Sequence, residues 1–165
     1  MIRFLSVVAV VFFAAVVPAR AGDTEDIKAA VAATYASISG PVGEARDWDA
    51  FRALFLPKAV FTVAFPGDLG EGRAVQLTVE EYVERSGPYL EQIGFIETET
   101  RSAIRQYGEM ATVVSAYSGV RSDTGEVVAT GVNTFILVKV ENVWKVGSIS
   151  WREADEDWPV DVMFD

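Results

Sequence analysis

The stretch that most constrains the fold is residues 131–153, where two runs rich in β-branched and aromatic residues flank the pair Glu141-Asn142. Two such runs separated by two turn-forming residues predict a β-hairpin. In the first run, residues 131–140, the side chains of both alternating phases are mostly apolar, so both faces need cover and the hairpin is predicted to lie inside a sheet. Asn133 is the exception, because a dry amide needs a hydrogen-bond partner or a ligand.

The N-terminus has the features of a secretory signal peptide. A single basic residue, Arg3, precedes the apolar residues 4–17, and Ala19 and Ala21 form an A-x-A cleavage site. The apolar run of about 14 residues is shorter than the roughly 20 that a membrane span needs. We therefore expect residues 1–21 to be removed and residues 22–165 to form one periplasmic or secreted domain with an acidic C-terminal tail, residues 154–165.

Charge and composition exclude several classes of function. The net charge of the chain is −10, and it becomes −12 without the two arginines of the leader, so nucleic acids and anionic membranes are not expected partners. The chain has no histidine and no cysteine, which excludes Ser-His-Asp catalysis, zinc sites, disulfides and a lipid anchor. No metal or cofactor is predicted, since the acidic residues 155–157 lack EF-hand spacing. Any catalyst must be Asp, Glu, Tyr, Lys or Arg.

Two helices are predicted in the first third of the mature chain. The first runs from a cap at Asp23 to about Ser39, and its apolar face has helical spacing. That face consists of Ile27, Val31, Thr34, Tyr35 and Ile38. The second is short, begins after a cap at Asp47 or Asp49 and is closed by Pro57. Its apolar side consists of Trp48, Phe51, Leu54 and Phe55.

A third helix and five strands are predicted beyond this point. The capping box Thr78–Glu81 starts the helix, and Gly94 ends it. Strands are expected at residues 60–65, 95–107, 110–121, 126–140 and 143–153, and a glycine-rich loop at residues 66–73. In the last strand Trp144 and Val146 are out of phase with Ile149 and Trp151, which predicts a bulge at Gly147.

The order of these elements predicts an α+β fold with three helices packed on a curved, mostly antiparallel sheet. With this order the chain resembles the nuclear transport factor 2-like superfamily, which includes the ketosteroid isomerases and the polyketide-cyclase-like (SnoaL-like) proteins. The resemblance covers about residues 24–153. Within the superfamily, the chain is similar to uncharacterised exported bacterial members. It rests on residues 46–55 leading into 59–61, on 78–82, on 131–135 and on 144–151.

The resemblance implies a cone-shaped pocket between helices and sheet. It places Tyr35 and Asn133 at the polar end, whereas the position of the isomerases' general base is Ala64. The expected pocket residues are Tyr35, Trp48, Phe55, Asn133, Phe135, Trp151 and Arg152. The alternatives are that the aromatic residues form core, that Asn133 bonds backbone and that Arg152 and Glu153 are solvated.

Two functions follow from this implied site. The first is binding of a small apolar molecule without efficient catalysis. The second is an isomerase- or cyclase-like enzyme for a small apolar carbonyl compound, which would need a further carboxylate near Tyr35 and Asn133. Glu97, Glu99, Arg101 and Arg105 share one phase of a predicted strand, which favours an exposed face or cross-strand pairs over a pocket. The apolar outer face of residues 110–140 predicts a homodimer, as the superfamily commonly forms.

Overall fold

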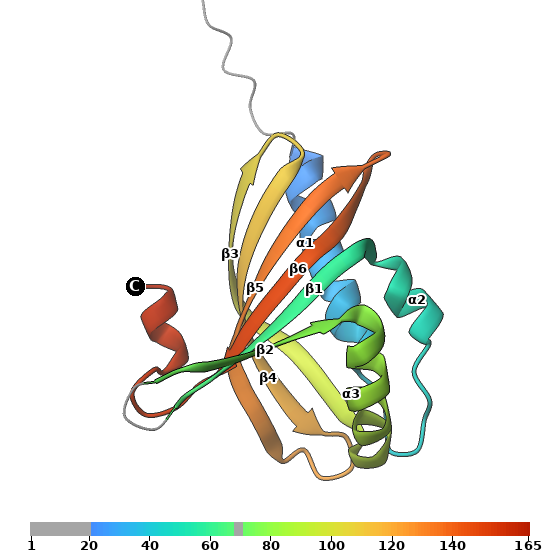
Figure 1. Ribbon diagram of the computed structural model, residues 1–165, viewed down its shortest axis with the longest axis vertical. Coiled ribbons are helices and arrows are strands. Elements are labelled where there is room, and N and C mark those ends of the chain that lie inside the picture. The colour runs from blue at the N-terminus through green and yellow to red at the C-terminus, as the bar shows by residue number, and fades with distance from the viewer. Residues whose placement is uncertain (1–20, 68–70) are drawn as a thin grey trace, which may run out of the picture.

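In the computed structural model, which describes residues 21–67 and 71–165, three helices lie on one face of a six-stranded, strongly curved sheet (Figure 1). The elements are α1 (Ala21–Ile38), α2 (Trp48–Ala53), β1 (Phe55–Phe65), β2 (Arg73–Thr78), α3 (Val79–Ile93), β3 (Phe95–Tyr107), β4 (Met110–Arg121), β5 (Val127–Val140), β6 (Val143–Glu153) and the 3-10 helix η2 (Val160–Met163). The strand order is β2-β1-β6-β5-β4-β3, in which only β1 and β6 are parallel neighbours. The predicted α+β class is confirmed.

The predicted hairpin forms the middle of the sheet. Glu141 and Asn142 have positive φ values of 49° and 65°, as a two-residue hairpin turn with the twist of its strands requires. Strand β5 pairs with β4 on one side and β6 on the other. The register shifts so that Ile136 faces Ser148 while Leu137 faces Val146. Gly147 is therefore the extra residue of the predicted bulge.

The first and third predicted helices are confirmed. The predicted face of α1 is buried throughout, and it lies against β3 and β6. Helix α3 begins with the predicted capping box, and Gly94 closes it in the left-handed conformation at a φ of 60°. One detail was wrong: Asp23 lies inside the first turn of α1 and does not cap it. Its carboxylate instead accepts a hydrogen bond from Lys139 Nζ at 2.5 Å.

Two boundaries differ from the sequence prediction. Helix α2, capped by Asp47, ends at Ala53, and the chain enters β1 at Phe55 before reaching Pro57. The short edge strand β2 was not predicted at all. Of the expected leader, residues 1–21, the first 20 lie outside the described residues, Ala19 among them, and Ala21 is the first residue of α1. None of the helices that the structure describes combines the length and apolarity needed to cross a membrane.

A buried arginine joins the ends of two helices. Arg46 is only 8% exposed, and its guanidinium donates to backbone carbonyls at the ends of both α1 and α3. The bonds from Nε to Ile38 O and from Nη2 to Leu90 O measure 3.0 and 3.1 Å. Carbonyls at helix ends lack partners within their helix and carry partial negative charge, so a cation suits this position. Arg46 thereby fixes the helices that cover the concave face.

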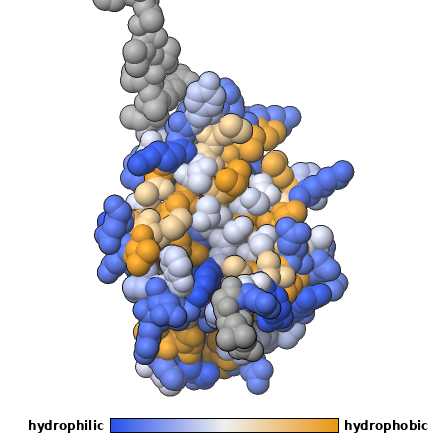
Figure 2. Space-filling model, turned by 60° about the vertical axis from the view of Figure 1, so that its left-hand side comes forward, coloured by the Kyte–Doolittle hydropathy of each residue, from blue (hydrophilic) through white to orange (hydrophobic). Residues whose placement is uncertain are grey.

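Among the described residues, the only helix on the convex face of the sheet is the short C-terminal segment. Helix η2 contacts β5, and Arg101 of β3 lies 4.6 Å from the ring centre of Phe164. Figure 2 brings this side of the molecule forward and shows apolar side chains gathered there among charged ones. Ile136 is the most exposed of the apolar residues near the centre of β5, at 40%.

Candidate functional site

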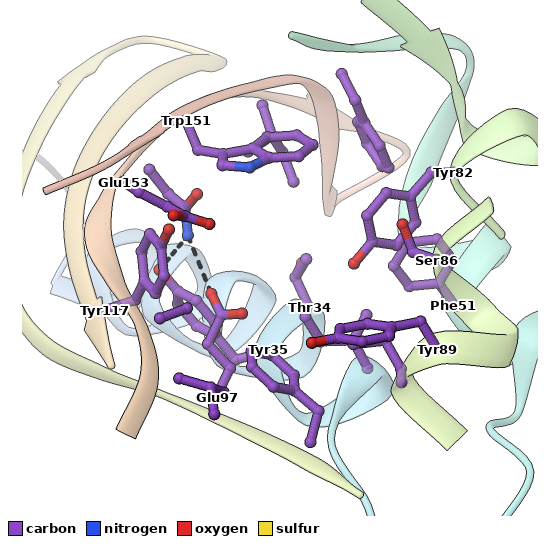
Figure 3. A pocket seen from close by; sticks show the side chains of 18 of the residues that line it. Thr34, Tyr35, Phe51, Tyr82, Ser86, Tyr89, Glu97, Tyr117, Trp151 and Glu153 are labelled. Atoms are coloured by element: carbon purple, nitrogen blue, oxygen red, sulfur yellow. Dashed lines mark hydrogen bonds between the residues drawn. The ribbon is translucent and has the colours of Figure 1, made fainter. Parts of the chain in front are cut away.

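A cavity of about 280 Å³ lies between the concave face of the sheet and helices α1 and α3. Its wall is mainly aromatic, and side chains from α1, α2 and α3 and from five strands reach it (Figure 3). The aromatic lining residues are Tyr35, Phe51, Phe61, Tyr82, Tyr89, Phe95, Tyr117, Phe135 and Trp151. The polar ones are Thr34, Ser86, Glu97, Asn133 and Glu153. Such an apolar chamber with few polar groups is the usual form of a small-molecule site.

Asn133 is the centre of the polar end. Its position on the inner face of β5, between β4 and β6, points the amide toward α1. Asn133 Nδ2 donates to the Tyr35 hydroxyl at 3.0 Å and to Glu97 Oε1 at 3.3 Å. The amide therefore bonds side chains from a helix and a second strand, not backbone.

The chain of hydrogen bonds continues beyond Tyr35. The Tyr35 hydroxyl lies 2.7 Å from Ser115 Oγ, and Ser115 donates to Glu99 Oε2 at 2.6 Å. Because Ser115 has a single hydroxyl hydrogen, which it gives to Glu99, Tyr35 must donate to Ser115. Tyr35 then accepts from Asn133, and its own hydrogen is not available to a ligand.

Glu97 is the group whose chemistry is most altered. It is half-buried and lines the cavity, and burial raises the pKa of its carboxyl group to about 7, while the hydrogen bond from Asn133 lowers it in part. Burial also raises the pKa values of Tyr35, Tyr82 and Tyr117, so these hydroxyls stay protonated near neutral pH. A carboxyl group that titrates near pH 7 in a cavity is a candidate acid–base catalyst.

A bulge in β3 brings Glu97 inward. Strand β3 pairs Glu99 with Tyr117 but Arg101 with Ala116, so Thr100 is an extra residue. Before it, the phase of Glu97 and Glu99 faces the cavity side. After it, the phase of Arg101 faces the convex side. The prediction that these charges share one exposed face was therefore wrong, and sequence reasoning missed the carboxylate at the site.

Two close approaches in this wall depend on glycine. A Cβ on Gly131 would lie 2.8 Å from the Tyr117 hydroxyl and 2.3 Å from the Arg152 carbonyl oxygen. A Cβ on Gly119 would lie 2.4 Å from the Phe95 ring. Both glycines leave room for the rings of Tyr117 and Phe95 beside the strands.

The seven expected pocket residues divide into two groups. Four of them line the cavity: Tyr35, Asn133, Phe135 and Trp151. The other three lie elsewhere, which corrects the expectation. Trp48 packs against Phe51, with ring centres 5.5 Å apart, and Phe55 packs against Phe51 and Phe61 below the cavity wall. Arg152 points away, to Asp155 at 2.6 Å, because β6 residues alternate and Trp151 takes the inner phase.

The same arrangement of helices and sheet occurs in solved proteins of low sequence identity. A nuclear transport factor 2-like protein with a cystatin-like fold from Novosphingobium aromaticivorans is 14% identical, with a TM-score of 0.65 over 87% of this chain and 90% of its own. The chain has the nuclear transport factor 2-like fold. No protein-family model and no curated protein sequence matches it.

Two further structures share the nuclear transport factor 2-like fold. A protein from Streptomyces avermitilis proposed as a dehydratase of this family is 16% identical, with a TM-score of 0.61 over 81% of this chain and 97% of its own. The beta subunit of a proposed aromatic-ring-hydroxylating dioxygenase from Novosphingobium aromaticivorans is 15% identical, with a TM-score of 0.61 over 81% and 90%. At these identities the likeness concerns the fold, and function must be argued from the site.

Proposed function

We propose that the protein is an exported enzyme that moves a proton on a small, largely apolar carbonyl compound, with Glu97 as the general base and acid. The observation that carries the proposal is the Glu97 carboxyl group, whose pKa is raised to about 7 in an aromatic cavity. At neutral pH such a group is present in both forms, so it can take up a proton and return it.

The surroundings of Glu97 support this role. The hydrogen bond from Asn133 Nδ2 orients the carboxylate, and its second oxygen accepts no side-chain hydrogen bond from the described residues. The hydroxyl groups of Tyr82 and Tyr89 face the cavity (Figure 3) and have no hydrogen-bond partner in the described part of the chain. Their protons are available to a substrate carbonyl oxygen, on which charge develops as the neighbouring C–H bond breaks.

Glu97 changes the balance between the two functions that the sequence left open. The sequence favoured binding without efficient catalysis, because Ala64 stands where the isomerases have their base. Glu97 reaches the cavity from another strand, β3, and lies within hydrogen-bond distance of Asn133. It is the carboxylate near Tyr35 and Asn133 that the catalytic alternative needed. The cavity volume limits the substrate to about one or two rings.

Exchange of ketone α-protons for deuterium tests the proposal. Small cyclic ketones are incubated with the protein in deuterated buffer, and exchange is followed by NMR. The exchange rate should rise with the ionised fraction of Glu97, with an apparent pKa near 7. Glu97→Gln should lower the exchange rate by about 10²-fold or more. Glu84→Gln, on the exposed side of α3, is the control with the same change of charge.

Either of two outcomes would contradict proton transfer. One is acceleration that survives in Glu97→Gln. The other is the absence of exchange for ketones that demonstrably bind, which would return the cavity to the binding function.

Export belongs to the same proposal and rests on the N-terminal sequence. The mature chain should begin at Gly22 and be recovered outside the cytoplasm. N-terminal sequencing of the protein from its host checks this. Recovery of a chain that retains Met1 in a membrane fraction would show that the N-terminal segment is a membrane anchor and not a cleaved signal peptide.

A further inference from the structure

The charges that line the cavity are all of one sign. Glu97 and Glu153 are its charged lining residues, and no lysine or arginine of the described chain reaches it. Within the described ranges 21–67 and 71–165, neither carboxylate has an ion-pair partner. Both act on the Tyr117 hydroxyl, whose pKa they raise in addition to burial, so they lie on the same side of the cavity. A bound anion would meet two carboxylates and no compensating cation.

The opposite wall is built of aromatic rings. Trp151 from β6 and Tyr82 and Tyr89 from α3 surround the open space that Glu97 and Glu153 face (Figure 3). An aromatic face is electron-rich and attracts a cation within about 6 Å of its centre, most strongly where water is excluded. A ring of aromatic side chains with a carboxylate nearby is therefore suited to an organic cation.

The charge of the whole chain acts in the same direction. The sequence has 24 acidic against 14 basic residues, so a long-range negative potential surrounds the molecule and favours the approach of cations. The basic residues that the structure describes near the site are engaged elsewhere: Arg152 with Asp155, and Arg101 with Phe164.

We infer that the ligand of this cavity carries a positive charge, as a small organic ammonium compound held between the rings of Tyr82, Tyr89 and Trp151 and the carboxylates of Glu97 and Glu153. The inference uses the same cavity as the proposed function and adds the charge of the substrate. The ammonium group would also acidify a neighbouring C–H bond, which suits proton removal by Glu97.

Binding of a cation should depend on pH through Glu97. The titratable or charged groups that face the cavity around Glu97 are Tyr35, Tyr82, Tyr89, Glu99, Tyr117 and Glu153. Burial raises the pKa values of Tyr35, Tyr82 and Tyr117, so these three stay neutral. Between pH 6 and pH 8 Glu97 passes from mostly protonated to mostly ionised, and cation affinity should rise accordingly.

A pair of isosteric probes tests the inference on the mature protein. Phenyltrimethylammonium and tert-butylbenzene have nearly the same shape and differ in one positive charge. Their dissociation constants are measured by NMR titration at pH 6 and pH 8. At pH 8 we expect phenyltrimethylammonium to bind at least about tenfold more tightly than tert-butylbenzene. At pH 6 this ratio of dissociation constants should be several-fold smaller.

Variants assign the effect to the cavity. Glu97→Gln should remove the pH dependence of cation binding. Glu153→Gln should raise the dissociation constant of phenyltrimethylammonium and leave that of tert-butylbenzene unchanged. Glu84→Gln makes the same change of net charge on the exposed side of α3 and should leave both constants unchanged.

The outcomes separate this inference from the proposed function. Equal or tighter binding of tert-butylbenzene at pH 8 overturns the cationic ligand but leaves proton transfer by Glu97 standing. Cation preference without ketone exchange supports the cationic ligand and removes the catalytic role. Binding of neither probe overturns the cationic ligand and the cavity as a binding site.

Discussion

Glu97 is a carboxylate that the fold holds at an energetic cost. Its pKa is raised from the ordinary value of 4.5 to about 7, so between these values the folded protein keeps a proton that the unfolded chain releases. Stability must therefore fall as the pH rises from about 4.5 to about 7, by roughly 3 kcal/mol at most. Ion-paired Glu80 and Asp123 have lowered pKa values, so their own contribution changes below pH 4.5.

Replacement of Glu97 should remove this pH dependence. Glu97→Gln has no group to ionise, so it should be more stable than the wild type at pH 8 and about equally stable at pH 5. Urea unfolding at both pH values measures the two differences, and Glu84→Gln should retain the wild-type slope. A loss of stability at pH 8 in Glu97→Gln would show that the carboxylate is stabilising in its ionised form.

Asn133 adjusts the same group. Its hydrogen bond lowers the Glu97 pKa against the effect of burial, so Asn133→Leu should raise that pKa further above 7. The variant should also lose about 1–3 kcal/mol, because Tyr35 and Glu97 lose their donor. NMR titration of the Glu97 carboxyl carbon gives the pKa, and an unchanged value would remove Asn133 from a positioning role.

At the scale of elements, α1 and α3 are joined through Arg46. Its guanidinium bonds carbonyls at both helix ends, including Ile38 O and Leu90 O. Arg46→Met keeps the apolar stem but removes the guanidinium from Ile38 O and Gly40 O and leaves Leu90 O with only the Gly94 N–H, so it should cost about 2–4 kcal/mol in the free energy of unfolding. Denaturant unfolding measures the loss. Arg85→Met, on the exposed side of α3, is the control and should change stability by less than about 0.5 kcal/mol.

The two bulges show which elements a sequence can reveal. At Gly147 the apolar residues change phase around a glycine, so the bulge could be predicted. Around Thr100 the residues are Glu, Thr and Arg, which are polar in both phases. The sequence therefore shows no shift in the apolar alternation that would reveal this bulge. The fold followed from apolar patterns, whereas Glu97 was missed because its inward phase depends on the second bulge.

Strand boundaries near α2 failed for a related reason. Phe55 continues the apolar spacing of the helix, and it also fits the first inward position of β1. Phe55 is buried against Phe51 and Phe61, as either a helix or a strand would require. It belongs to the strand because it pairs with Val146 of β6. Strand β2, at the sheet edge, has a single buried residue, Leu77, and thus offers little pattern.

For the whole molecule, the main open feature is the convex face of the sheet. The helices cover the concave face, and η2 contacts only part of the other (Figure 1). Near the centre of β5 the outward phase carries Val132, Thr134, Ile136 and Val138, which are half-buried or exposed. An apolar sheet face that the described elements leave largely uncovered is a typical dimer surface, and we propose a two-fold homodimer through it.

A charge at the centre of this face should abolish the dimer. Ile136 points outward and is 40% exposed, so Ile136→Lys should leave the monomer folded while placing two like charges near the symmetry axis. Light scattering at micromolar concentration should then give the mass of one chain, in contrast to two for the wild type. Tyr107→Lys, at the 85% exposed tip of the β3–β4 hairpin, should remain dimeric. A monomeric wild type would contradict the proposal. It would mean that the polar residues and the partial burial of the apolar residues on this face are enough to keep the monomer soluble.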